Sequence, residues 1–192
     1  MDLTRVMVMG CSGAGKSTFA RALAARTGLP LIHLDQEYWS PGWVERYRLP
    51  DWLDRVEELA QGERWIIDGN YSNSLPLRLP RATAVLWLDL PRWLCLTSTM
   101  RRCLTGYRRS RPDMAPGCVE QWDWGFYLFI WHWFKRSRPR VIRLLAQPEY
   151  APLVQRFRTR RAAWEWMQRL PNSEPASLPS LNTAPVESGC IE

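Results

Sequence analysis

The sequence predicts an α/β fold in which helices connect the strands of a five-stranded parallel sheet. Short apolar runs, typical of buried parallel strands, alternate along the chain with longer segments of helical periodicity. The chain has 192 residues, of which 46% are hydrophobic, and this suffices for one domain with a substantial core. No internal repeat is visible.

The first sixty residues supply two strands and two helices. Residues 4–9 (TRVMVM) form a short apolar run that suits a buried strand. In residues 16–26 apolar side chains recur at helical spacing, and Gly28 ends this helix. Residues 29–34 (LPLIHL) are the second predicted strand. Residues 50–60 form a helix with an acidic residue near its start, where negative charge is favourable.

The middle of the chain adds two strands and a helix. Residues 65–67 and 83–88 are apolar runs, and each leads into an aspartate. Pro91 begins a helix that reaches about residue 104, because proline is tolerated at the first helical position. Residues 106–117 combine basic residues with glycine and proline, so we expect a mobile loop there.

The last part of the predicted domain is mostly helical. We expect helices at residues 120–136 and 139–146, a fifth strand at residues 153–157, and a final helix at residues 159–170. The domain is therefore expected to span residues 1–170.

Two further expectations concern the tail and the location of the protein. Residues 171–192 are rich in Pro, Ser, Asn and Glu without periodicity, so we predict a disordered tail. No signal peptide is recognisable, and the most apolar stretch, residues 124–134, is shorter than the ~20 residues of a membrane-spanning helix. We expect a cytoplasmic protein with no membrane partner.

Cysteine spacing and net charge narrow the classes of partner. The five cysteines form no CxxC pair, so neither a zinc site nor a disulfide framework is expected. The formal net charge is +7, and arginine supplies nearly all of the basic residues. Because guanidinium groups suit phosphates, both nucleotides and nucleic acids fit this charge.

The strongest motif is GCSGAGKS, residues 10–17, which satisfies G-x-x-x-x-G-K-[ST] between a predicted strand and a predicted helix. Glycines let the backbone N–H groups approach phosphate oxygens, and the helix presents its positive end to the same anion. Lys16 would reach the β- and γ-phosphates of ATP, and the Ser17 hydroxyl would bind Mg²⁺. The predicted nucleotide-binding residues are Gly10, Ser12, Gly13, Ala14, Gly15, Lys16, Ser17 and Thr18.

Three aspartates follow predicted strands, where ligands gather in open α/β sheets. Asp68 is our candidate for the carboxylate near magnesium. Asp35 is our candidate for substrate contact or for the base that accepts a proton from the phosphorylated hydroxyl. Acidic residues also cap helices without taking part in chemistry, and Asp89, which directly precedes Leu90 and Pro91, fits that role best.

Arginines and aromatic residues form two further groups. Six arginines and no acidic residue lie between residues 90 and 112. A basic mobile loop can close over a nucleotide and neutralise the transferring phosphoryl group, although a solvated basic face would give the same pattern.

The aromatic residues of the 120–136 helix follow two faces, which suits burial, a partner surface, base stacking or a membrane surface. The aromatic side chains of residues 38–43 could line a substrate cavity or cover the sheet edge.

Six motifs in this order resemble the bacterial proteins called DNA topology modulation protein, which belong to the adenylate-kinase-like P-loop kinases: GCSGAGKST, HLDQEYWSPGW, WIIDGNYS, VLWLDLPRWLC, RRSRPDMAPGC and FKRSRPR. The resemblance implies a three-layer fold with helices on both faces of the sheet and a small helical lid at about residues 101–140. It implies that lid arginines act beside Lys16 and Asp35 in catalysis, namely Arg101, Arg108, Arg109 and Arg111. Residues 68–72 depart from the DGFPR-like segment of adenylate kinase, so AMP gains no support as the acceptor.

The sequence therefore favours an ATP-binding phosphotransferase that moves the γ-phosphoryl group, with Mg²⁺, to a small nucleotide, nucleoside or other hydroxyl acceptor. We expect a monomer or a weak dimer. The alternative is a nucleic-acid-associated ATP-binding regulator that affects DNA topology, which the charge and the tryptophans would suit. No helix-turn-helix or zinc module is recognisable. A third possible function is that of a scaffold that binds ATP without hydrolysing it or transferring its phosphoryl group.

Overall fold

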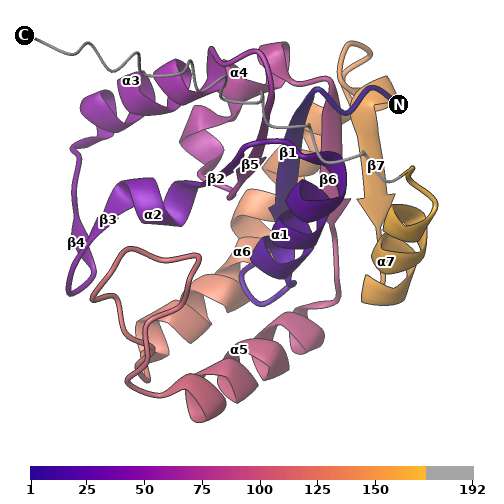
Figure 1. Ribbon diagram of the computed structural model, residues 1–192. Coiled ribbons are helices and arrows are strands. Elements are labelled where there is room, and N and C mark those ends of the chain that lie inside the picture. Colours follow the sequence, from indigo (N-terminus) through magenta and orange to yellow (C-terminus); the bar gives the residue numbers. More distant parts are fainter. Residues whose placement is uncertain (172–192) are drawn as a thin grey trace, which may run out of the picture.

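Five parallel strands form one sheet in the computed structural model, which describes residues 1–171 (Figure 1). The strands are β1 (Arg5–Gly10), β2 (Leu31–His33), β5 (Trp65–Asp68), β6 (Ala84–Leu88) and β7 (Val154–Phe157), in the spatial order β2-β5-β1-β6-β7. The central strand is β1, where Val8 pairs with Asp68 on one side and with Leu86 on the other. The predicted parallel sheet of five strands is confirmed.

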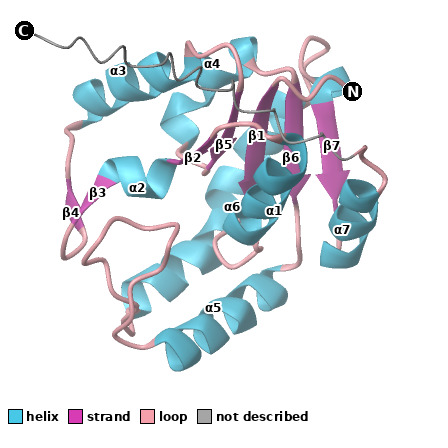
Figure 2. Ribbon diagram, viewed as in Figure 1, coloured by secondary structure: helices cyan, strands magenta, loops and turns pink. Residues whose placement is uncertain are grey.

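Helices connect the strands and surround the sheet (Figure 2). The longer helices are α1 (Lys16–Thr27), α3 (Leu49–Ala60), α5 (Arg92–Gly106), α6 (Trp124–Leu145) and α7 (Arg160–Gln168). Shorter helical pieces are α2 (Leu34–Tyr38), α4 (Leu75–Arg78) and the 3₁₀ turns Ser72–Ser74, Leu79–Arg81 and Ala151–Leu153. Neither α2 nor α4 was predicted from the sequence. Because α2 begins at Leu34, the second strand is shorter than predicted, and Asp35 lies on a helix.

Alternating side chains of β1 divide the core into two layers. Val6 and Val8 pack with residues of α1 and α7, whereas Met7 and Met9 pack with residues of α3 and α4. These four side chains are at most 1% exposed. Successive residues of a strand point to opposite faces, so a strand that is covered on both faces is apolar at every position. The expected helices on both faces of the sheet are present.

The start of α6 differs from the prediction. Residues 120–123 are not helical, because the backbone of Glu120 forms hydrogen bonds with Arg108 and Arg109 across the loop between them. The helix begins at Trp124, where the Asp123 carboxylate accepts a hydrogen bond of 2.8 Å from the N–H of Gly125. Such side-chain caps satisfy N–H groups that have no partner within the helix. The predicted start at Glu120 was therefore wrong.

The two helices predicted at residues 120–136 and 139–146 are one helix, α6, which passes through Pro139. An internal proline removes one backbone hydrogen bond and crowds the preceding turn. Packing on both sides holds the helix together here, since Trp133 and Val141 are both at most 4% exposed. Arg138, next to the proline, donates two hydrogen bonds of 2.8 Å to Asp89 at the end of β6.

Asp89 has a structural role, but it does not cap the next helix, because the N-cap of α5 is Pro91 and has no side-chain hydrogen bond. Asp89 also accepts hydrogen bonds from Arg156 of β7. Burial disfavours ionisation of Asp89, but the hydrogen bonds from the two guanidinium groups outweigh it and lower the pKa of the carboxyl group. Asp89 thus joins β6, β7 and α6 at the edge of the site.

The region predicted as a lid, residues 101–140, consists of the end of α5, an irregular loop at residues 107–123, here called the lid loop, and the first part of α6. The arrowheads of the strands in Figure 2 point toward this end of the molecule. The lid loop packs against a two-stranded ribbon of β3 (Trp39–Ser40) and β4 (Val44–Glu45), where Trp43 Nε1 donates to the carbonyl of Val119 at 2.9 Å. The loop expected to be mobile is thus docked on an unpredicted ribbon.

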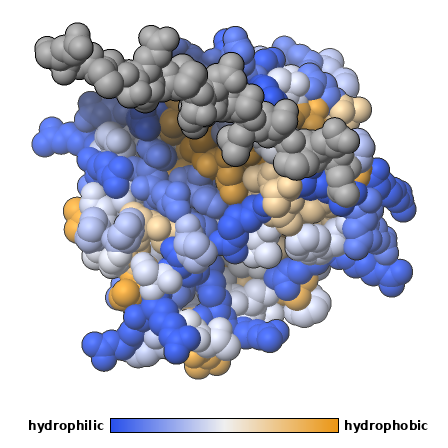
Figure 3. Space-filling model, viewed as in Figure 1, coloured by the Kyte–Doolittle hydropathy of each residue, from blue (hydrophilic) through white to orange (hydrophobic). Residues whose placement is uncertain are grey.

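Three further observations concern the described part of the chain. No helix in residues 1–171 is both long enough and apolar enough to span a membrane. In the same residues, Cys11, Cys95, Cys103 and Cys118 are buried free thiols. The face seen in Figure 3 is dominated by hydrophilic side chains with apolar patches between them. Apart from Pro171, the predicted disordered tail lies outside the described residues.

Candidate active site

The loop between β1 and α1 is curled by three glycines with positive φ, namely Gly10 (147°), Gly13 (81°) and Gly15 (97°). Only glycine adopts such angles readily. The N–H of Ala14 donates to the carbonyl of Cys11 at 3.0 Å, which closes the turn. Lys16 opens helix α1, and its Nζ lies 3.4 Å from the same carbonyl oxygen. The result is a concave run of backbone at a helix N-terminus, a geometry that suits anions.

Neighbouring elements hold this loop in place. A Cβ atom at Gly13 would lie 2.2 Å from the carbonyl oxygen of Cys95 on α5, so the two backbones are in direct contact. The side-chain amide of Asn70 accepts from the N–H of Gly10 at 3.0 Å and donates to its carbonyl at 2.6 Å. Asn70 thereby couples the end of β5 to the start of the loop.

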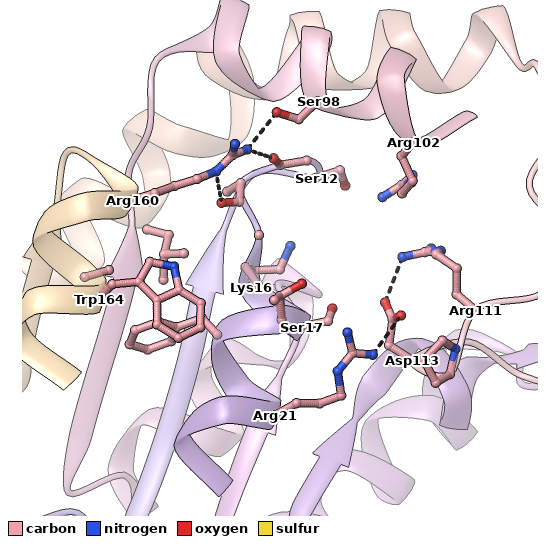
Figure 4. A pocket seen from close by; sticks show the side chains of 18 of the residues that line it. Ser12, Lys16, Ser17, Arg21, Ser98, Arg102, Arg111, Asp113, Arg160 and Trp164 are labelled. Atoms are coloured by element: carbon pink, nitrogen blue, oxygen red, sulfur yellow. Dashed lines mark hydrogen bonds and ion pairs between the residues drawn. The ribbon is translucent and has the colours of Figure 1, made fainter. Parts of the chain in front are cut away.

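A cavity of about 510 Å³, here called the loop cavity, lies over the glycine loop and is bounded by α1, α5, the lid loop and α7 (Figure 4). Its size is that of a ligand site. Five basic side chains and one acidic side chain line it: Lys16, Arg21, Arg102, Arg111, Arg160 and Asp113. The excess of cations suits a polyanion.

Arg160, at the start of α7, contacts the glycine loop with its side chain (Figure 4). Its guanidinium group donates to the carbonyls of Gly13 at 2.8 Å and Ala14 at 3.3 Å, and to Ser98 Oγ at 2.7 Å. Sequence reasoning missed this residue. It follows the carboxyl end of the fifth strand, so the rule that pointed to the aspartates could have found it.

Two carboxylates orient the arginines of the lid. Arg111 forms ion pairs with Asp113 at 2.7 Å and with Glu120 at 2.5 Å. Arg102 also pairs with Glu120, at 3.1 Å, and Arg21 of α1 lies 3.6 Å from Asp113. Because Asp113 and Glu120 are buried, they hold these cations at fixed positions around the cavity.

The predicted lid arginines divide into two groups. Arg111 lines the loop cavity, and Arg102, which was not among the predicted catalytic residues, lines it as well. Arg101, Arg108 and Arg109 are exposed and line neither this cavity nor the one described next. A helix turns 100° per residue, so adjacent positions such as 101 and 102 face different directions, and a sequence motif does not separate them.

A second cavity, of about 380 Å³, lies beside Asp35 and is here called the aromatic cavity. Its walls carry seven aromatic rings, those of Tyr38, Trp39, Trp52, Tyr71, Phe126, Phe129 and Trp133. The aromatic segment after Asp35 thus lines a cavity through Tyr38 and Trp39. One face of α6 lines it as well. Trp43, from the same segment, lines the loop cavity.

Tyr71 positions Asp35 in this cavity. The Tyr71 hydroxyl donates to Asp35 Oδ1 at 2.7 Å, and no residue within 1–171 forms a hydrogen bond with Oδ2. Tyr71 has a φ of 35°, a strained value for a residue other than glycine. The buried Arg78 supports this backbone by donating to the carbonyls of Gly69 and Asn70.

The pKa values of Asp35 and Tyr71 are both raised. Burial raises the pKa of the Asp35 carboxyl group, and the hydrogen bond from Tyr71 opposes this effect only in part. Burial and the neighbouring Asp35 raise the pKa of Tyr71, so its hydroxyl remains a donor. Asp35 therefore binds a proton more readily than an exposed aspartate does, as a catalytic base must.

Asp68, the predicted carboxylate near magnesium, is buried at the end of β5. Its Oδ2 lies 2.8 Å from Nδ1 of His33, and its Oδ1 has no hydrogen-bond partner within residues 1–171. Asp68 lines neither cavity, whereas Ser17 lines the loop cavity. The sequence did not indicate His33 as the partner of Asp68.

The two cavities meet at the glycine loop. Ser12, Lys16 and Phe126 line both of them. The Lys16 ammonium group is thus shared between a cavity rich in arginine and a cavity that contains Asp35.

Comparison of the sequence with known proteins gives a partial match. No family model matches the chain. YqaC of Bacillus subtilis (strain 168), an uncharacterized protein, is 34% identical to it over 67 residues, which are 33% of this chain and 36% of YqaC. The match therefore spans little more than a third of that relative.

Solved structures of kinases have a similar fold. Shikimate kinase from Acinetobacter baumannii, in complex with shikimate, gives a TM-score of 0.52 at 20% identity over 86% of this chain and 89% of that one. A sugar kinase from Janibacter sp. HTCC2649 gives 0.50 at 19% identity (88% and 92%), and shikimate kinase from Bacteroides thetaiotaomicron gives 0.50 at 19% identity (86% and 95%). The chain has their α/β P-loop kinase fold. The resemblance to DNA topology modulation proteins stays a prediction.

Gly13 allows a sharp test of the loop geometry. We expect Gly13→Ala to lower the free energy of unfolding by about 1–3 kcal/mol more than Gly42→Ala does, because overpacking typically has this cost. The two glycines have nearly equal φ values, 81° and 79°, but a Cβ at Gly42 would meet nothing within 4 Å. Urea titration of both variants measures the difference. Equal losses of stability would contradict the contact with α5.

Proposed function

We propose that the protein is an ATP-dependent phosphotransferase that moves the γ-phosphoryl group to a hydroxyl group of a small acceptor. One observation carries the proposal: Lys16 lines both the loop cavity and the aromatic cavity. A cation at the junction of two ligand cavities can bind a phosphoryl group while that group passes from one ligand to the other. The kinase names of the structural neighbours support the same reaction class.

The loop cavity would hold the nucleotide. Residues 12–18 of the loop and the start of α1 line it. A Cβ at Gly10 or Gly13 would collide with the backbone of Leu88 or Cys95, so the two glycines let the loop pack closely against β6 and α5. Arg102 and Arg111 lie on the lid side, where they can neutralise charge on the β- and γ-phosphates. We propose that the predicted residues between Gly10 and Thr18 bind this nucleotide.

The residues present fit a magnesium ion bound with the nucleotide. Mg²⁺ in such sites is held by phosphates, water and one or two protein oxygens. Ser17 offers a hydroxyl in the cavity. Asp68, which lines neither cavity, has a buried carboxylate oxygen without a hydrogen-bond partner within residues 1–171 and would act on the water shell of the ion. The ion would neutralise the phosphates when bound, and His33 would keep the Asp68 carboxylate in place.

The aromatic cavity would hold the acceptor. Asp35, with Tyr71 on Oδ1, can accept the hydroxyl proton on Oδ2. Arg101, Arg108 and Arg109 lie away from both cavities, so we propose Arg102 and Arg111 for the roles that the motif suggested for the lid.

An acceptor screen tests the proposal. Purified protein is incubated with γ-labelled ATP, Mg²⁺ and a panel of sugars, nucleosides, nucleotides and alcohols, and transfer of label to each acceptor is measured. We expect label transfer that depends on a particular acceptor, with little ATP consumption in its absence. Transfer to none of these compounds would contradict the proposal and favour an ATP-binding scaffold. The nucleic-acid alternative and the expected monomer or weak dimer stay predictions.

A further inference from the structure

We propose that the acceptor is an uncharged molecule that combines a flat apolar ring with hydroxyl groups, and that phosphorylated and carboxylated molecules are poor acceptors. This inference rests on the proposed function and specifies its substrate class. The contrast between the charges that line the two cavities carries it.

The charge balance of the aromatic cavity is unlike that of the loop cavity. Among the residues that line it, only Lys16 and Asp35 carry a charge, so the balance is zero. In the loop cavity five basic residues face one acidic residue. Lys16 belongs to both cavities, and a nucleotide would engage it. An anionic acceptor would then meet the Asp35 carboxylate without a cation of its own, which is unfavourable in a partly buried site.

Three arginines of the surrounding elements already have partners. Arg138 donates both of its hydrogen bonds to Asp89. Arg78 is fully buried and donates to backbone carbonyls. Arg111 pairs with Asp113 and Glu120 on the side of the loop cavity. Breaking any of these contacts would leave a buried carbonyl oxygen or carboxylate without its hydrogen-bond partner, which costs stability.

The walls of the cavity favour a flat ring. Tyr38, Trp52 and Tyr71 pack together with ring centroids 4.9–5.1 Å apart and with ring planes tilted by 57–66° from one another. Phe126 and Trp133 of α6 contribute further rings to the same cavity. Aromatic surfaces bind flat apolar groups through dispersion and stacking, without any need for charge.

Short polar side chains at the same cavity suit hydroxyl groups. Ser72, Asn73 and Ser137 line it and are neutral hydrogen-bonding groups. Together with the Oδ2 atom of Asp35, they can bind the hydroxyl groups of a nucleoside, a glycoside or an aromatic alcohol. A volume of about 380 Å³ is sufficient for a molecule of this size.

The reaction balances with these groups. The acceptor oxygen forms a bond to the γ-phosphorus while the bond between that phosphorus and the β–γ bridging oxygen breaks. The hydroxyl proton moves to Asp35, and ADP leaves with the electron pair of the broken bond. The proton is released to water when the phosphorylated product departs.

Matched pairs of compounds test the acceptor class. Nucleosides are compared with their 5′-monophosphates, and aryl glycosides with the corresponding uronic acids. Each compound is titrated by calorimetry into the protein with Mg²⁺ and a non-hydrolysable ATP analogue, and is then assayed for ADP release with ATP. In at least one pair the uncharged member should bind about tenfold more tightly or better, and should be the better substrate.

A charge-introducing variant provides an independent comparison. Asn73 is exposed and lines the cavity, so Asn73→Arg supplies the missing cation without disturbing the core, and Asn73→Gln is its neutral control. We expect only the arginine variant to shift preference toward the anionic member, by about tenfold.

The outcomes separate the two proposals. Tighter binding of the anionic member by the unmodified protein, or binding of no uncharged member, would overturn the inference. Binding of uncharged members without acceptor-dependent ADP release would support this ligand class but overturn the phosphotransferase.

Discussion

Replacing Lys16 with alanine is expected to reduce kcat/KM for ATP by at least about a hundredfold, since loss of one preorganised charge-stabilising donor typically has an effect of this size. Lys16 is the only cation that lines both cavities among the described residues. Its only hydrogen bond within residues 1–171 is long, 3.4 Å to the carbonyl of Cys11, so the fold does not depend on it. Steady-state kinetics with an active acceptor gives the ratio.

The other lysine provides a matched control. Lys135 is exposed and lines neither cavity, so Lys135→Ala should retain the kinetic constants of the unmodified protein. Circular dichroism and thermal unfolding would establish that both variants are folded. A folded Lys16→Ala protein with normal turnover would remove the central residue of the proposed mechanism.

Asp35→Asn is expected to lower kcat by about 10²–10⁴-fold, the usual contribution of a general base. Asparagine has nearly the same shape, and its oxygen can still accept the hydrogen bond from Tyr71. The variant therefore removes basicity with little change in packing. Glu37→Gln on the same helix, which weakens a contact with Arg55, is the control and should retain activity. Normal turnover in Asp35→Asn would rule out Asp35 as the base.

The raised pKa of Asp35 gives this variant two further signatures. A base must be ionised, so kcat/KM of the unmodified protein should fall as the pH drops through the raised pKa, and Asp35→Asn should lack this dependence on Asp35. A raised folded-state pKa means that Asp35 contributes stability below its unfolded pKa, and that this contribution is lost as the pH rises through the folded pKa. Near neutral pH, Asp35→Asn should therefore unfold at an equal or higher temperature.

Sequence patterns predicted the sheet and the glycine-rich loop because both depend on local signals. An apolar strand, a glycine-rich turn and an amphipathic helix such as α3 are encoded by consecutive residues. The five strands were found for this reason. The ribbon of β3 and β4 was missed because each of its strands has only two residues, which is too short for any periodicity to appear.

The partners of the site residues could not be predicted in the same way, because they are distant in the sequence. Asp35 meets Tyr71 across 36 positions, and Arg160 meets Gly13 across 147. Such pairs follow from the strand order of the sheet, which the periodicity of single segments does not specify. Two helices were predicted in place of α6 because proline disfavours a helix interior. Packing of the residues on both sides of Pro139 overrides this local preference.

The bonds from Arg160 to Gly13 and Ala14 also bear on how the protein matures during synthesis. The glycine loop leaves the ribosome among the first twenty residues, but its outer support comes from residue 160. The strand that carries this support toward the loop, β7, pairs with β6 at the far edge of the sheet. A nascent chain consequently cannot complete the proposed phosphate site until nearly the whole domain has emerged, so a bound nucleotide would stabilise only finished molecules.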